Sequence, residues 1–150
     1  MKQMVEPLKA VGIEINLYYI GRLRKEVLKL PRTIKKLNKI CEGYDIIHAQ
    51  YGSMTGYLVS RVEGTKIISL RESDWYRIKQ FFPLFDYVHG TASTTFSKCA
   101  LKRYKHVITM SNRMGEEVLQ FKKGISIDAL SDAIDLNKFK PLNYLLLVKN

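Results

Sequence analysis

The sequence predicts an α/β fold in which a parallel sheet is flanked by helices. Short runs rich in apolar and β-branched residues cover 44–49, 65–70 and 106–110, and segments with helical periodicity separate them. The first run is almost fully apolar, which suits a buried parallel strand better than an edge strand. Because strands that alternate with helices form parallel sheets, we expect a Rossmann-like arrangement of about four or five strands.

The composition is that of a single globular domain. The chain has 150 residues, of which 46% are hydrophobic and 26% are charged. Its longest apolar runs, such as 144–148, are too short to cross a bilayer, and residues 1–12 lack the pattern of a secretory signal. Cys41 and Cys99 make neither a disulfide framework nor a metal-binding pair. We therefore expect a chain of the reduced cytoplasm.

The N-terminal third is predicted to contain a helix end, a strand and a basic helix. Residues 1–10 resemble the end of a helix that Gly12 stops, and 13–20 is rich in β-forming residues, which predicts a strand. Apolar residues recur in steps of four or three over 23–40, on one face of a helix. Pro31 interrupts that pattern, so we expect a kink, or a second helix with Pro31 in its first turn.

The rest of the chain is predicted to alternate between helices and strands. Gly90 is a candidate interruption of a long helical stretch, and Ser111 is a good N-cap for the helix that follows it. The further helices are expected over 52–62, 83–104 and 112–121, and a last strand over 125–130, before a loop that runs to Pro141.

Polar turns follow three of the predicted strands. They cover 48–52, 71–74 and 111–113. In parallel sheets, ligands bind at the carboxyl ends of the strands, so these turns are where a functional site is expected. Their backbone and side-chain donors favour a phosphate or a sugar over an apolar ligand.

At these turns the sequence resembles the retaining, nucleotide-sugar-dependent glycosyltransferases of family 4. Residues 44–52 (YDIIHAQYG) resemble that family's D-V-I-H-A-H-x-G strand and loop, and residues 66–74 (KIISLRESD) are similar to its P-x-V-x-T-x-H/R-G-S-D turn. Residues 106–111 (HVITMS) resemble A-D-x-V-I-x-V-S, and residues 129–141 (ALSDAIDLNKFKP) resemble I-P-N-G-V-D-x-x-x-F-x-P. The four patterns stand in the family's order at plausible spacing.

The resemblance implies the N-terminal, acceptor-side half of a two-domain GT-B fold. That Rossmann-like half would span 1–141, without its first strand, and 142–150 would begin the linker to an absent donor domain. The intact enzyme would move a sugar from a nucleotide-sugar donor to a glycan or lipid-linked acceptor, with no metal or other cofactor. We therefore expect that this chain alone transfers no sugar.

The resemblance also places substrate- and acceptor-binding residues on the three turns, while it assigns no catalytic residue. They are Arg71, Ser73 and Asp74 after one strand, His48 at the end of the preceding strand with Tyr51 and Gly52 in the loop that follows it, and Ser111 and Arg113 after the next strand. Two alternatives stay open: His48 can be a structural histidine, and the turn that contains Ser73 and Asp74 can simply cap a following helix.

Three departures from the family pattern bear on the details of the site. Glu72 stands where the family has glycine, and a carboxylate beside a diphosphate is repulsive unless it points away. Arg71 replaces a frequent histidine, and Asp132-Ala133 replaces an Asn-Gly pair that suits a left-handed turn.

The net charge of +11 is concentrated in one segment. Residues 22–39 hold eight basic residues and one acidic residue. They form either a solvated helix face or an interfacial helix on anionic lipid, where each basic residue contributes about 1 kcal/mol. The basic residues are Arg22, Arg24, Lys25, Lys29, Arg32, Lys35, Lys36 and Lys39. The second reading would make the protein peripheral on the inner face of the cell membrane.

Other chemistries have little support in the sequence. Asp128, Asp132 and Asp135 match no common metal-ligand spacing, and no G-x-S-x-G elbow, phosphate loop or dinucleotide fingerprint occurs. The aromatic run that starts at Trp75 and Tyr76 suits core packing and an acceptor-facing wall better than stacking on bases. The competing functions are a nucleotide-sugar epimerase and a basic adaptor, although no nucleic-acid-binding motif supports nucleic acid as a partner.

Overall fold

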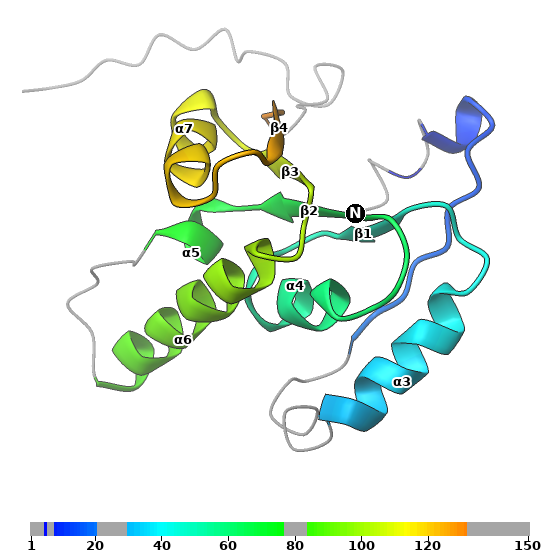
Figure 1. Cartoon of the computed structure of the whole chain (residues 1–150), viewed down its shortest axis with the longest axis horizontal. Coiled ribbons are helices and arrows are strands. Elements are labelled where there is room, and N and C mark those ends of the chain that lie inside the picture. Colours follow the sequence, from blue (N-terminus) through cyan, green and yellow to red (C-terminus); the bar gives the residue numbers. More distant parts are fainter. Residues whose placement is uncertain (1–4, 6–7, 21–29, 77–83, 132–150) are drawn as a thin grey trace, which may run out of the picture.

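The computed structural model describes Val5 and residues 8–20, 30–76 and 84–131 (Figure 1). This part of the chain contains a four-stranded parallel sheet flanked by helices, which is consistent with a Rossmann-like fold. The strands are β1 (Ile47–Ala49), β2 (Lys66–Leu70), β3 (His106–Thr109) and β4 (Ser126–Ala129). The helices are α3 (Leu30–Cys41), α4 (Ser53–Ser60), α5 (Glu72–Trp75), α6 (Leu84–Leu101) and α7 (Asn112–Phe121).

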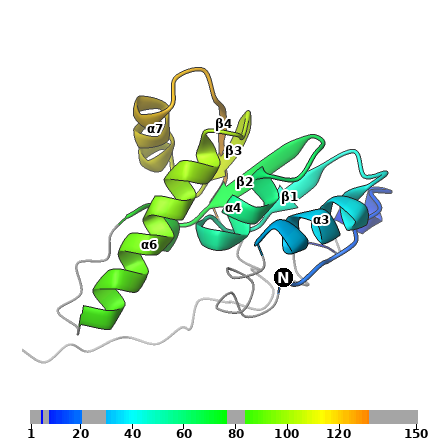
Figure 2. The same cartoon turned by 60° about the horizontal axis from the view of Figure 1, so that its bottom comes forward.

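The strand order places the connecting helices on one face of the sheet. The spatial order β1-β2-β3-β4 is also the chain order, and crossovers between parallel strands are right-handed, so successive connections stay on the same side. Gly56 of α4 lies against Ile68, and Gly115 of α7 lies against Ile127. Since Ile68 and Ile127 both pair with Val107, they share a face. Figures 1 and 2 show α4 between α3 and α6 within this layer.

The two faces of the sheet differ in burial. The face under the helices is apolar and buried, and its residues are Ile47, Ala49, Ile68, Leu70, Val107 and Thr109. The opposite face carries His48, Ser69, His106 and Asp128, which are half-buried or exposed. Within the described part of the chain, α4, α6 and α7 therefore cover one face only.

Tyr104 joins the helical layer to the start of β3. Its side chain is fully buried, and its hydroxyl donates a hydrogen bond of 2.8 Å to the carbonyl oxygen of Gly56 in α4. Burial raises the pKa of Tyr104, because the phenolate form would lose its hydration. The ammonium group of Lys122, just after α7, donates to the carbonyl oxygens of Leu101 and Tyr104. These bonds fix the turn between α6 and β3.

Helix α3 confirms part of the prediction for the basic segment. The described helix covers Leu30–Cys41 and includes Pro31. Leu37 is buried in the core, and Leu30 and Ile34 pack against it, as the apolar periodicity predicts. Residues 21–29, the first half of the predicted helix, lie outside the described residues.

The predicted strand over 13–20 is wrong. These residues have no regular secondary structure, and among the described strands β1 pairs with β2 alone. Their side chains are mostly exposed, with Tyr19 at 69% and Ile13 at 50%. A β-forming composition predicts a strand only where a neighbouring ladder and a buried face exist. This segment has no ladder among the described strands, and Ile20 at its end is the residue that packs against the core.

The remaining elements follow the prediction with local differences. Gly90 does not interrupt α6, which is continuous from Leu84 to Leu101. Helix α7 has the predicted bounds, and the Ser111 side chain caps it by accepting a hydrogen bond of 3.3 Å from the N–H of Met114. The predicted polar turn over 71–74 contains the short helix α5. The predicted loop to Pro141 and the segment 142–150 lie beyond the described residues.

Candidate functional site

The loops that follow β1, β2 and β3 meet at the carboxyl edge of the sheet. The strands are parallel and in register, so that Leu70 at the end of β2 lies opposite Thr109 at the end of β3. The carboxyl ends of neighbouring strands therefore share one edge, as the sequence predicts for the three polar turns. Side-chain contacts between these loops define the geometry of the candidate site.

Asp74 connects the first two loops. Its side chain is only 5% exposed, and one carboxylate oxygen accepts hydrogen bonds from the backbone N–H groups of Gly52 at 3.0 Å and Arg71 at 3.3 Å. A buried carboxylate needs such donors because it has left water. Asp74 therefore caps α5 and holds the loop after β1, which makes it a positioning residue rather than an exposed ligand.

The space around the Gly52 backbone is too small for any side chain. A Cβ atom there would lie 2.5 Å from the hydroxyl of Ser97 and 2.9 Å from the Cβ of Asp74. The next residue, Ser53, has a left-handed φ of 53°, which is strained for a non-glycine residue. Its N–H donates to the Ser97 hydroxyl at 2.6 Å. Ser97 of α6 thus supports this loop, and no sequence signal marks it, because the contact spans 44 positions.

Arg71 lies between the loops after β1 and β3. Its guanidinium lies 5.3 Å from the centre of the Tyr51 ring, and Nη1 is 3.9 Å from the sulfur of Met110. The first contact has cation–π geometry. The Tyr51 ring is 44% exposed, so Arg71 and Tyr51 together offer a planar donor and an aromatic face at the edge. The structure brings together these two residues that the sequence predicts for the site.

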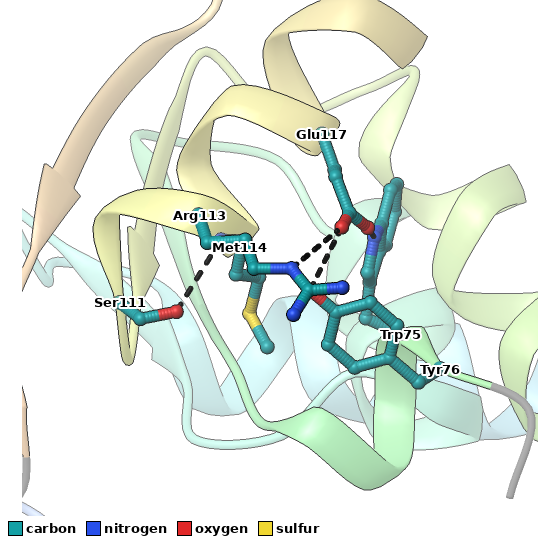
Figure 3. Close-up of polar contacts among 6 residues, drawn as sticks. All are labelled: Trp75, Tyr76, Ser111, Arg113, Met114 and Glu117. Atoms are coloured by element: carbon teal, nitrogen blue, oxygen red, sulfur yellow. Dashed lines mark hydrogen bonds and ion pairs between the residues drawn. The ribbon is translucent and has the colours of Figure 1, made fainter.

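Arg113 and Ser111 belong to the start of α7, shown with their neighbours in Figure 3. The hydroxyl of Ser111 is used in the helix cap. The side chain of Arg113 is 83% exposed, and its Nε lies 3.5 Å from the Glu117 carboxylate. Glu117 also accepts hydrogen bonds from the indole N–H of Trp75 at 3.0 Å and the hydroxyl of Tyr76 at 3.1 Å. Glu117 is a second residue that sequence reasoning missed.

The remaining predicted residue of this edge, Ser73, is exposed on α5 beside the exposed Glu72.

Burial and the carboxylate of Glu117 raise the pKa of Tyr76, so the Tyr76 hydroxyl stays protonated as a donor. The edge therefore combines cationic donors, hydroxyl groups and aromatic rings. This set of groups can bind a polyhydroxylated or anionic ligand.

His48 lies in the middle of β1, on the open face of the sheet, rather than in the loop. Its Nε2 is 2.8 Å from the hydroxyl of Ser69 on β2. Neighbouring protein atoms desolvate the ring and lower the pKa of His48, which favours the neutral form. Within the described residues no carboxylate contacts this ring, so the pair lacks the third group that activates a serine nucleophile. The contact is a cross-strand hydrogen bond.

His106 and Asp128 form a second cross-strand pair on the same open face. His106 Nε2 lies 2.6 Å from a carboxylate oxygen of Asp128. Asp132 and Asp135 lie outside the described residues. In the ranges that the structure describes, no group of three or more His, Cys, Asp or Glu residues could hold a metal ion.

The basic residues of α3 are exposed. They are Arg32, Lys35, Lys36 and Lys39. The Lys36 ammonium lies 5.7 Å from the centre of the Tyr18 ring, and Tyr18, Leu17 and Tyr19 are exposed large side chains of the preceding segment. The other predicted basic residues, Arg22, Arg24, Lys25 and Lys29, lie outside the described residues. Among the described helices, none is long and apolar enough to cross a membrane.

No protein-family model, curated protein or solved structure matches the chain. The interpretation of the site therefore rests on the geometry of the carboxyl edge and on the resemblance of its turns.

Replacement of Asp74 by alanine tests its positioning role. The variant Asp74→Ala leaves two backbone N–H groups without their acceptor, so we expect the free energy of unfolding to fall by about 2–3 kcal/mol. Urea denaturation measures the change, with Asp45→Ala, at an exposed carboxylate, as the matched control. Equal small losses in both variants would contradict the assignment.

The stability of the protein should also depend on pH through His48. Because its folded-state pKa is lowered, the unfolded chain binds a proton more readily, and stability falls as the pH drops below the usual histidine value of about 6.5. The variant His48→Asn keeps a polar side chain beside Ser69 and removes the titration. Urea denaturation at about pH 7.5 and 5.5 should show a smaller loss in the variant; equal losses would refute the role of His48.

Proposed function

We propose that the chain is the acceptor-side half of a GT-B glycosyltransferase that resembles family 4. The intact enzyme would move a sugar from a nucleotide-sugar donor to a glycan or lipid-linked acceptor. The observation that supports this proposal is the junction of the three family-like turns at one edge, where Asp74 holds Gly52 and Arg71 together.

The chemistry of the edge fits acceptor recognition. A sugar hydroxyl both donates and accepts hydrogen bonds, and the edge offers the Arg71 guanidinium, the Tyr51 ring and the exposed Arg113. Rigid placement of an acceptor hydroxyl lowers the entropic barrier to transfer, and Asp74 provides that rigidity from a buried position. This half supplies shape and orientation, while the resemblance assigns the nucleotide-sugar to the second domain.

The epimerase and the basic adaptor make different predictions for the same surface. An epimerase would release an altered nucleotide-sugar without an acceptor, and an adaptor would bind nucleic acid with strong salt dependence. Contact with anionic lipid through α3 stays a prediction, favoured by its exposed basic residues and the exposed Tyr18 and Tyr19. Co-sedimentation with anionic and neutral vesicles tests it, and equal binding to both would count against it.

Acceptor binding provides the direct test of the proposed function. We expect isothermal calorimetry to detect binding of at least one neutral trisaccharide from a panel of maltotriose, cellotriose, chitotriose and mannotriose. Arg71→Ala should weaken that binding about tenfold, because it removes a charged donor. Arg103→Ala, at an exposed arginine away from the edge, is the matched control. Binding that is equal in both variants, or tight binding to duplex DNA instead, would contradict the proposal.

A further inference from the structure

A groove between α6 and α7 lies beside the carboxyl edge. None of the eight predicted binding residues lines it, whereas Trp75 and Tyr76 of the predicted acceptor-facing wall do. Its volume is about 760 Å³, within the range of roughly 300–1,000 Å³ that is usual for small-molecule sites. Figure 1 shows α5 between the two helices. The lining includes Trp75, Tyr76, Lys98, Glu117, Gln120 and Phe121, together with threonines of α6.

Trp75 provides a fixed floor for the groove. It is 6% exposed, its indole N–H donates to Glu117 at 3.0 Å, and its ring meets the Phe121 ring edge-to-face at 5.7 Å between centroids. Edge-to-face pairs of this kind add to the stability of an aromatic cluster. The Phe121 ring is itself 41% exposed, so the groove presents an apolar surface on a rigid base.

Glu117 provides an acceptor within the groove. Its two oxygens accept hydrogen bonds from Trp75 and Tyr76, and Arg113 approaches one of them at 3.5 Å (Figure 3). A carboxylate has about four lone-pair sites, so capacity remains for a ligand hydroxyl. The contact with Arg113 also connects this groove to the carboxyl edge.

The wall formed by α6 provides a cation and hydroxyl oxygens. The ammonium of Lys98 lies 5.3 Å from the centre of the Trp75 ring and 5.7 Å from that of Phe121. The hydroxyl of Thr95 donates to the carbonyl oxygen of Thr91 at 2.8 Å, and its own oxygen can still accept a hydrogen bond. Opposite this wall, the exposed amide of Gln120 can both donate and accept.

This combination restricts the chemical class of the ligand. The carboxylate of Glu117 lines the groove together with Lys98, and it repels an anion such as phosphate at close range. A purely apolar ligand would remove both charged groups from water without replacing their hydrogen bonds. A neutral ring with an apolar face and a rim of hydroxyl groups satisfies the aromatic surface and the polar groups together. A hexose unit of a glycan has that form.

We propose that the groove between α6 and α7 binds one sugar unit of a neutral oligosaccharide. This inference rests on the proposed function, because only that function makes the bound glycan the acceptor. It adds a second subsite to the acceptor site at the strand ends. Arg113 at the edge lies 3.5 Å from Glu117 in the groove, so one acceptor chain can contact both.

Trp75 is the only tryptophan of the chain, so its fluorescence reports directly on the groove. Titration of the 150-residue chain with the four trisaccharides of the acceptor panel should change Trp75 emission in a saturable way. Gln120→Ala and Lys98→Ala should each weaken the apparent affinity about three- to tenfold, because each removes a hydrogen-bonding partner of the sugar.

Glu116→Ala and Lys102→Ala are the matched controls, since both residues are exposed and outside the groove. The proposal is overturned if no trisaccharide changes Trp75 emission, if all four variants behave alike, or if inorganic phosphate produces the same saturable change. A trisaccharide that binds by calorimetry and depends on Arg71, but leaves Trp75 emission unchanged, would overturn this inference while the proposed function stands. If a trisaccharide changes Trp75 emission with the same apparent affinity in Arg71→Ala as in the unchanged chain, the groove binds the sugar without Arg71. That result would support this inference and contradict the proposed function.

Discussion

The carboxylate of Asp74 accepts backbone hydrogen bonds from two different loops, and the geometry of the carboxyl edge depends on this contact. Without it, the N–H groups of Gly52 and Arg71 would be left without their acceptor. The contact also explains why glycine occupies position 52 and why Ser53 tolerates a left-handed backbone, since strain persists only where the surroundings fix it. With both loops fixed, Arg71 is held between Tyr51 and Met110.

The order of the strands determines where ligands can be recognised. Because all crossovers turn the same way, the described helices α4, α6 and α7 cover one face of the sheet. The carboxyl edge then presents polar loops, and the groove between α6 and α7 opens next to them. On the open face lie the cross-strand pairs His48–Ser69 and His106–Asp128.

Local sequence signals predicted most of the fold. The strand that was predicted wrongly and the site residues that were not predicted depend on contacts between distant segments. Helix α7 has its predicted bounds because Ser111 caps it within one turn, and the apolar periodicity places Leu37 of α3 in the core for a similarly local reason. The strand predicted over 13–20 fails because strand formation depends on a partner that composition does not show. Within the site, the turns themselves were predicted. Ser97 and Glu117 were not, since each acts on a residue about forty positions away in the sequence.

We propose that a carbohydrate is recognised at the edge that Asp74 organises. The most direct measurement is a two-dimensional ¹H–¹⁵N NMR titration of the chain with the trisaccharide that binds best in calorimetry. We expect the largest amide shifts at Gly52, Ser53, Arg71 and Ser111, at the carboxyl ends of the strands. Shifts confined to the basic face of α3, or to the opposite edge of the sheet, would contradict it.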